Sequence, residues 1–214
     1  MSVRWYFDFI SPFSYLQWQK VKALPDAVTP VPIVFGAVLA AHGQKGPAEI
    51  TGKREFTYRH VLWQARQEGV ALRFPPAHPF NPLAALRLCV AAGSTVAAVD
   101  AVFDWIWRRG EAGDSIDALA PVAAALGIDA ASTQHEAVKA QLRANTEAAI
   151  AAGVFGVPTL AFDDGALDGG PLDGMLFWGN DAHAFALAAL RNPEMLSDPE
   201  MQRVSTLPVG VQRR

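Results

Sequence analysis

The stretch Val3-Arg4-Trp5-Tyr6-Phe7-Asp8-Phe9-Ile10-Ser11-Pro12 decides the fold, because a strand pattern in it runs directly into a helix start. Residues 3–9 alternate in a way typical of a β-strand, with one large apolar face formed by Val3, Trp5, Phe7 and Phe9. Tyr6 and Asp8 face the other way. Ser11 offers a hydroxyl suited to an N-cap, and Pro12 has the fixed φ that suits the first helical position. We therefore expect a helix from Ser11 to about Leu24.

A second apolar run, Val31 to Phe35, is bracketed by prolines and predicts a second strand. Residues 1–36 thus have the order strand, helix, strand. This order is typical of the start of an α/β unit.

Residues 37–153 carry helix signals only. Lys53 to Gln67 has a helical pattern, and four further helices have start and stop residues. They are expected from Asn81-Pro82 to Gly93, from Ser94 or Thr95 to Gly110, from Asp114 or Ser115 to Gly127, and from a Thr133/Glu136 capping box to Gly153. Val99, Val102, Phe103, Ile106 and Trp107 form an apolar stripe at helical spacing, which indicates core packing.

Strand character returns at residues 159–162 and 175–178, on either side of a loop rich in Gly and Asp. This arrangement predicts a hairpin, followed by a last helix from about Asp181 to Leu190. The tail beyond Pro193 has no clear pattern. The order of elements predicts an α/β protein with a thioredoxin-like fold and a large all-helical insertion between its second and third strands. We expect residues 1–36 and 154–214 to form the thioredoxin-like domain and residues 37–153 the helical insertion domain.

Composition narrows the function classes. The chain has 214 residues, 51% of them hydrophobic and 18% charged, which is typical of a globular protein. The net charge of −3 argues against a nucleic-acid partner, and no apolar run reaches the roughly 20 residues that span a membrane. The N-terminus lacks a signal-peptide pattern, so a secretory signal is not expected. The presence of one cysteine favours a cytoplasmic protein. The single cysteine, Cys89, excludes an intramolecular disulfide, and the five histidines lack metal-site spacing, so no metal is expected.

Ser11-Pro12-Phe13-Ser14 is the first candidate site. Unpaired N–H groups and the helix dipole favour an anion at such a helix start, and a thiolate placed there is stabilised. Because this segment has no cysteine, the thiol must come from another molecule, and the Ser11 hydroxyl would donate a hydrogen bond to its sulfur. The alternative is that Ser11 is only an N-cap, which contributes about 1 kcal/mol to helix stability.

Two later segments complete the candidate site. In Gly156-Val157-Pro158-Thr159, a cis Val157–Pro158 bond would let the backbone of Val157 pair with an extended peptide ligand. In Trp178-Gly179-Asn180-Asp181, an aspartate and the start of a helix are suited to the ammonium and carboxylate of an amino-acid-like ligand. Helix capping by Asn180 or Asp181 is the alternative.

Five blocks together resemble the 2-hydroxychromene-2-carboxylate isomerases and the related kappa-class glutathione transferases. They are Asp8 to Leu16, Gly52-Lys53-Arg54, Phe74-Pro75-Pro76 through Asn81-Pro82-Leu83, Gly156 to Thr159, and Phe177 to Asp181. The blocks follow the family order from residue 5 to about 190. The resemblance implies a glutathione-dependent isomerase of aromatic catabolism, and a homodimer. The isomerases use the thiolate of glutathione as a borrowed nucleophile that adds reversibly to the substrate double bond.

The resemblance also implies roles for individual residues. Ser11 and Ser14 occupy the positions of the two cysteines in related disulfide oxidoreductases, so disulfide exchange is not expected and Ser11 is the catalytic residue. The implied glutathione contacts are Ser11, Phe13, Gln44, Lys53, Val157, Pro158, Asn180 and Asp181, with Asn81 and Pro82 at the small aromatic substrate. For Lys53 a solvated helix-end lysine, and for Asn81 a helix cap, are the alternatives.

Two segments depart from the family pattern. Gln44 stands where the family usually has an asparagine that contacts glutathione, and the hairpin loop from Asp163 to Gly174 is longer than usual. Two other functions therefore stay open. One is a glutathione transferase of the kappa type, and the other is a non-catalytic thioredoxin-like binding module.

Overall fold

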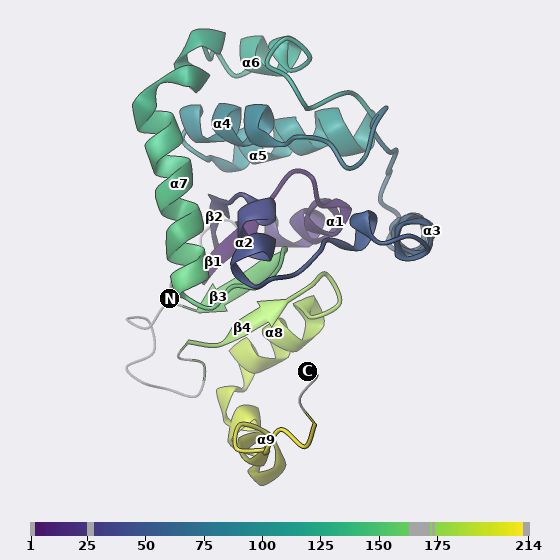
Figure 1. Cartoon of the computed structure of the whole chain (residues 1–214), viewed down its shortest axis with the longest axis vertical. Helices are drawn as coiled ribbons and strands as arrows, with labels where there is room; N and C mark the ends of the chain where they lie inside the picture. Colours follow the sequence, from purple (N-terminus) through teal and green to yellow (C-terminus); the bar gives the residue numbers. More distant parts are fainter. Residues whose placement is uncertain (1–2, 25–27, 163–171, 173, 212–214) are drawn as a thin grey trace.

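A four-stranded sheet forms the centre of the computed structural model, which describes residues 3–24, 28–162, 172 and 174–211 (Figure 1). The strand order is β2-β1-β3-β4, with β1 at Val3–Phe7, β2 at Val28–Pro32, β3 at Thr159–Phe162 and β4 at Leu176–Trp178. β2 runs parallel to β1, whereas β3 is antiparallel to both β1 and β4. This mixed sheet confirms the expected α/β, thioredoxin-like fold.

The alternation along β1 divides the core between the two faces of the sheet. Trp5 and Phe7 pack with Trp18 of α1 (Pro12–Val21), and the rings of Trp5 and Trp18 stack 5.2 Å apart. Tyr6 points to the other face, where it packs among residues of α2 (Phe35–Ala41) and α7 (Glu136–Ala151). The sheet is thus covered on both sides, which places the end of β1 and the start of α1 inside the protein.

All regular structure between β2 and β3 is helical, as the sequence predicts. After α2 it comprises α3 (Lys53–Gln67), α4 (Leu83–Ala91), α5 (Val96–Phe103), a π-helical turn at Asp104–Arg108, α6 (Ala120–Ala125) and α7, with short 3₁₀ turns at Pro47–Glu49 and Ala130–Gln134. The predicted stripe on α5 and the turn after it is fully buried. Cys89 is also buried, which raises its pKa to about 12. The division of the chain into two domains stays a prediction.

Three predicted boundaries are wrong. The second strand begins at Val28 rather than Val31, because its limits are set by pairing with β1 from Val3↔Val28 to Phe7↔Pro32. The helix expected from residue 114 or 115 is only the short α6. The capping box at Thr133 does not form, because its hydroxyl donates to the carbonyl of Ala130, and α7 starts without a side-chain cap.

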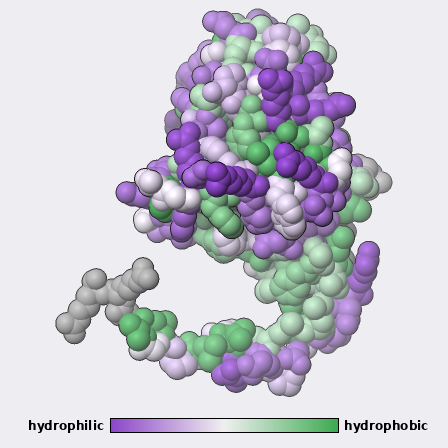
Figure 2. Space-filling model, turned by 90° about the vertical axis from the view of Figure 1, so that its right-hand side faces the viewer, coloured by the Kyte–Doolittle hydropathy of each residue, from purple (hydrophilic) through white to green (hydrophobic). Residues whose placement is uncertain are grey.

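The C-terminal part follows the expected order of hairpin and helix. β3 and β4 are antiparallel neighbours and α8 spans His183–Arg191, while the predicted loop lies largely outside the described residues. The tail, which the sequence left unassigned, forms a 3₁₀ turn at Pro193–Ser197 and α9 at Pro199–Val204. Figure 2 shows the tail extending away from the body of the protein.

The inserted helices are tied to the segment that follows β1 by a buried hydrogen bond. The indole Nε1 of Trp107 donates to the carbonyl of Phe9 at 2.7 Å, and Trp107 is fully buried. Trp107→Phe keeps an aromatic ring but leaves this carbonyl without its donor. We expect the variant to lose about 1–3 kcal/mol of unfolding free energy. Chemical denaturation measures this loss, and an unchanged midpoint would show that the bond contributes nothing.

Candidate functional site

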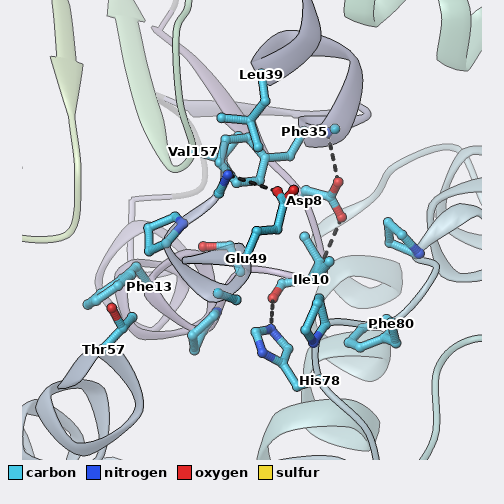
Figure 3. Close-up of a pocket in the computed structure, with 18 of the residues that line it drawn as sticks. Asp8, Ile10, Phe13, Phe35, Leu39, Glu49, Thr57, His78, Phe80 and Val157 are labelled. Carbon is cyan, nitrogen blue, oxygen red and sulfur yellow. Dashed lines mark hydrogen bonds between the residues drawn. The ribbon is translucent and has the colours of Figure 1, made fainter. Parts of the chain in front are cut away.

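A cavity of about 830 Å³ lies where β1 ends and α1 begins (Figure 3). Its walls come from segments that are far apart in the chain, at residues 8–13, 34–49, 57–83, 157 and 178–181. They are largely apolar and aromatic. They include Phe13, Phe35, Tyr58, Phe80 and Trp178. The volume lies within the range of sites for small ligands and cofactors.

Ser11 lies at the cavity wall and caps α1, so the predicted N-cap is confirmed. Its Oγ accepts the backbone N–H of Ser14 at 3.2 Å, and the residue is 7% exposed. An Oγ that accepts this bond still has its own proton to donate into the cavity. Ser14, in contrast, is fully buried, and its hydroxyl has no hydrogen-bond partner among the described residues.

The turn that leads to Ser11 is held by Asp8, a buried residue that also lines the cavity. Its carboxylate accepts the N–H of Ile10 at 3.0 Å and that of Phe35 at 2.9 Å, as Figure 3 shows. Its backbone carbonyl accepts the N–H of Ser11. Burial raises the pKa of the Asp8 carboxyl to about 7, although the N–H groups of Ile10, Phe35 and Phe9 act in the opposite direction. Asp8 therefore links the turn before Ser11 to the start of α2.

His78 holds the same turn from the opposite side. Its Nε2 lies 2.8 Å from the carbonyl oxygen of Ile10, and its Nδ1 lies 2.5 Å from the hydroxyl of Tyr58. Arg54 donates to both the Tyr58 hydroxyl and the His78 carbonyl. Burial lowers the pKa of His78, and the nearby Arg54 adds to this effect, whereas the bond to Ile10 opposes it.

Val157 lines the cavity next to a proline. The Val157–Pro158 peptide bond is cis, as the site hypothesis requires. Among the described residues no hydrogen bond uses the N–H or C=O of Val157, whereas the carbonyl of Pro158 accepts the N–H of Gly179 at 2.8 Å. Val157 therefore has one donor and one acceptor available for a ligand in the cavity.

Asn180 and Asp181 differ in how much of their side chains is available. The amide of Asn180 accepts from Lys20 at 3.0 Å and donates to Glu68 at 3.2 Å, and these two residues form an ion pair at 2.8 Å. Gln17 fixes the same loop by donating to the carbonyl of Gly179. Asp181 is exposed and lines the cavity. Its carboxylate is therefore the one suited to a ligand cation.

The structure brings most of the predicted site residues to this cavity. The lining includes Ser11, Phe13, Asn81, Pro82, Val157, Asn180 and Asp181. Pro158 lies buried next to Val157 without lining the cavity, and the exposed residues Gln44 and Lys53 also lie outside its lining. The Asn81 side chain accepts the N–H of Leu83, the first residue of α4, at 3.1 Å, but the N-cap position of α4 is Pro82.

Sequence reasoning missed Asp8, Tyr58 and His78 as site residues. A carboxylate on the polar face of a buried strand was a signal for Asp8. His60 of α3 also lines the cavity. Nothing local marked Tyr58 or His78, because their contacts join segments 20 to 68 residues apart.

Neither a metal-binding cluster nor a membrane-spanning helix is found among the residues that the structure describes. In those ranges no three histidine, cysteine or carboxylate side chains gather as metal ligands. No helix among them is both long and apolar enough to cross a bilayer.

Comparison with known proteins agrees with this fold. The profile of the DSBA-like thioredoxin domain matches residues 2–191. The 2-hydroxychromene-2-carboxylate isomerase of Pseudomonas putida is 31% identical over 85% of this chain and 90% of its own, and that of Pseudomonas sp. (strain C18) is 29% identical over 84% and 85%. A solved structure of 2-hydroxychromene-2-carboxylate isomerase superposes with a TM-score of 0.74 and 25% identity, covering 94% of this chain and 99% of that one. The chain belongs to the family of DSBA-like thioredoxin domains, and 2-hydroxychromene-2-carboxylate isomerases are among its homologues.

Proposed function

We propose that the protein is a glutathione-dependent cis-trans isomerase. It would interconvert 2-hydroxychromene-2-carboxylate and trans-o-hydroxybenzylidenepyruvate, or a related intermediate of aromatic catabolism. The observation that carries the proposal is the Ser11 hydroxyl at the start of α1, with its proton free to donate into a cavity that Val157 also lines. The homologous isomerases support the reaction type.

The residues of the cavity fit glutathione in three respects. The free N–H and C=O of Val157 match the backbone of an extended peptide, which would add to them as a strand does. Asp181 supplies an exposed carboxylate for the γ-glutamyl ammonium. Ser11 lies at the helix start, where backbone N–H groups and the helix dipole favour the charge of a thiolate. Bound glutathione would supply the nucleophilic thiolate for reversible addition to the substrate double bond.

The chain itself would perform the remaining tasks. Ser11 would donate a hydrogen bond from its hydroxyl to the thiolate, which favours the ionised form of the thiol. The aromatic walls, including Phe35 and Phe80, would hold an aromatic substrate and exclude water from it. Asn81 and Pro82, which also line the cavity, would contact that substrate. Asn180 would hold the loop of Asp181 in place through its bonds to Lys20 and Glu68.

An absorbance assay tests the proposal. It follows the isomerisation of 2-hydroxychromene-2-carboxylate by the purified protein in the presence of glutathione. We expect turnover that depends on glutathione. Turnover of a chlorinated nitrobenzene without isomerisation would indicate a transferase instead. Calorimetry that detects no glutathione binding at millimolar ligand would indicate a binding module of another kind.

Asp181→Asn tests the γ-glutamyl contact. Removing the charge while keeping the shape should raise the KM for glutathione about tenfold, since a hydrogen bond to a charged group contributes about 1.5–3 kcal/mol and this one is exposed. The turnover number should change little. Glu147→Gln on the outer face of α7 removes the same charge away from the cavity and is the matched control. Equal KM values for the two variants would exclude this role of Asp181.

A further inference from the structure

The peptide group between Ile10 and Ser11 is held at both ends. Its N–H, which belongs to Ser11, donates to the backbone carbonyl of Asp8 at 3.1 Å. Its C=O, which belongs to Ile10, lies 2.8 Å from Nε2 of His78. Since this peptide carries the Cα of Ser11, its orientation determines where the Ser11 hydroxyl points.

The hydrogen-bond partners of His78 determine which nitrogen of the neutral ring carries the proton. A carbonyl oxygen can only accept a hydrogen bond, so Nε2 must be protonated and must donate to the carbonyl of Ile10. In a neutral ring Nδ1 is then an acceptor, and the Tyr58 hydroxyl at 2.5 Å is its donor. In this arrangement the single Tyr58 proton goes to Nδ1 rather than to the His78 carbonyl, which lies 2.8 Å from the same hydroxyl and accepts a hydrogen bond from Arg54 Nη2 at 2.6 Å.

Packing fixes the ring plane as well. The His78 ring meets four aromatic rings edge to face, at centroid distances of 5.1 Å to Tyr58, 5.4 Å to Trp107, 5.7 Å to Phe74 and 6.2 Å to Phe80. The ring therefore has little freedom to turn away from the carbonyl of Ile10. Burial, which lowers the pKa of His78, favours the neutral ring, in which the Tyr58 hydroxyl donates to Nδ1.

We propose that His78 is a positioning residue for Ser11, acting through the Ile10–Ser11 peptide group, with Tyr58 holding the histidine in its Nε2–H tautomer. The inference rests on the proposed function, because it assigns His78 a part in directing the Ser11 hydroxyl to the thiolate of glutathione. His78 does not itself touch the sulfur in this role. Arg54 completes the chain of donors by donating to the Tyr58 hydroxyl at 3.1 Å.

Substitutions at residue 78 separate positioning from general packing. His78→Leu removes the donor to Ile10, whereas His78→Gln keeps an N–H donor at nearly the same reach. The measurement is an ultraviolet pH titration of the glutathione thiolate bound to the protein, without substrate. We expect a higher thiol pKa in His78→Leu, and a value close to that of the wild type in His78→Gln. A small misplacement of a reacting group can lower rates about 100-fold, so kcat should fall about 10- to 100-fold in the leucine variant and within about threefold in the glutamine variant.

His135→Leu is the matched control, since His135 is exposed at the start of α7 and its side chain makes no capping bond. If His78→Leu does not fold, Tyr58→Phe replaces it, and its bound thiol should again titrate at higher pH than in the wild type. A long-range ¹H–¹⁵N spectrum of the wild type should show protonated Nε2 and unprotonated Nδ1. The opposite tautomer would overturn the proposal.

The titration distinguishes the two ways of failing. If the wild type leaves the thiol pKa of glutathione at its value in free solution, the proposed function fails and the role of His78 falls with it. If the wild type lowers that pKa and folded His78→Leu lowers it equally, the proposed function stands and the positioning role is wrong.

Discussion

Ser11→Ala is expected to lower the glutathione-dependent kcat about 100- to 1,000-fold, the loss seen when one donor to a developing or resident anion is removed. The hydroxyl of Ser11 is the polar group that the start of α1 directs into the cavity, and alanine leaves the sulfur without it. The bound thiol should titrate at higher pH in the variant. Loss of the N-cap should also remove about 1 kcal/mol of unfolding free energy, which is too little to unfold the protein.

Ser14→Ala is the control for this prediction. It removes the same hydroxyl group one helical turn away. The Ser14 hydroxyl is buried and has no hydrogen-bond partner among the described residues. Its effect on kcat and on stability should be small, because no hydrogen bond is broken. Ser11→Thr keeps a hydroxyl and should retain part of the activity. Equal turnover in Ser11→Ala and Ser14→Ala would mean that Ser11 is only an N-cap.

Local signals account for the parts of the fold that the sequence predicted well. Ser11 and Pro12 place the start of α1 through their own chemistry, and the alternation of residues 3–9 assigns each side chain of β1 to one face of the sheet. β2 is different. Two of its five residues are prolines, and its limits follow from pairing with β1, so its position could not be derived from its own pattern.

The site could be predicted only where a residue acts through its own backbone or its place on an element. Val157 and Asp181 belong to this class, since a proline and a helix start mark them. The amide of Asn180 is bound by Lys20 and Glu68, which are 160 and 112 residues away in the chain. The sequence therefore could not show that this amide is already engaged within the protein and is not available to a ligand. The same reasoning applies to His78, whose partner Ile10 is 68 residues distant.

Asp8→Asn should reveal a buried carboxyl whose ionisation opposes folding. Burial raises the pKa of Asp8 from 3.8 to about 7, so between these values the folded protein holds a proton that the unfolded chain releases. The contribution of Asp8 to stability is therefore complete below about pH 4 and is lost as the pH rises through about 7. The difference between the two pKa values corresponds to at most about 4 kcal/mol. Asparagine does not titrate, so the variant lacks this pH dependence.

The measurement is the difference in Tm between the wild type and Asp8→Asn at about pH 4 and pH 8. Asparagine cannot accept both the Ile10 and the Phe35 N–H with one oxygen, which lowers the stability of the variant by an amount that does not depend on pH. The wild type should thus have the higher Tm at pH 4, and its advantage should shrink by about 10 °C at pH 8, given roughly 2–4 °C per kcal/mol for a chain of this size. Taking the difference cancels the titration of the histidines, which both proteins share. A Tm difference that stays constant, or that grows with pH, would mean that Asp8 is ionised in the folded protein across this range, and that its N–H donors outweigh its burial.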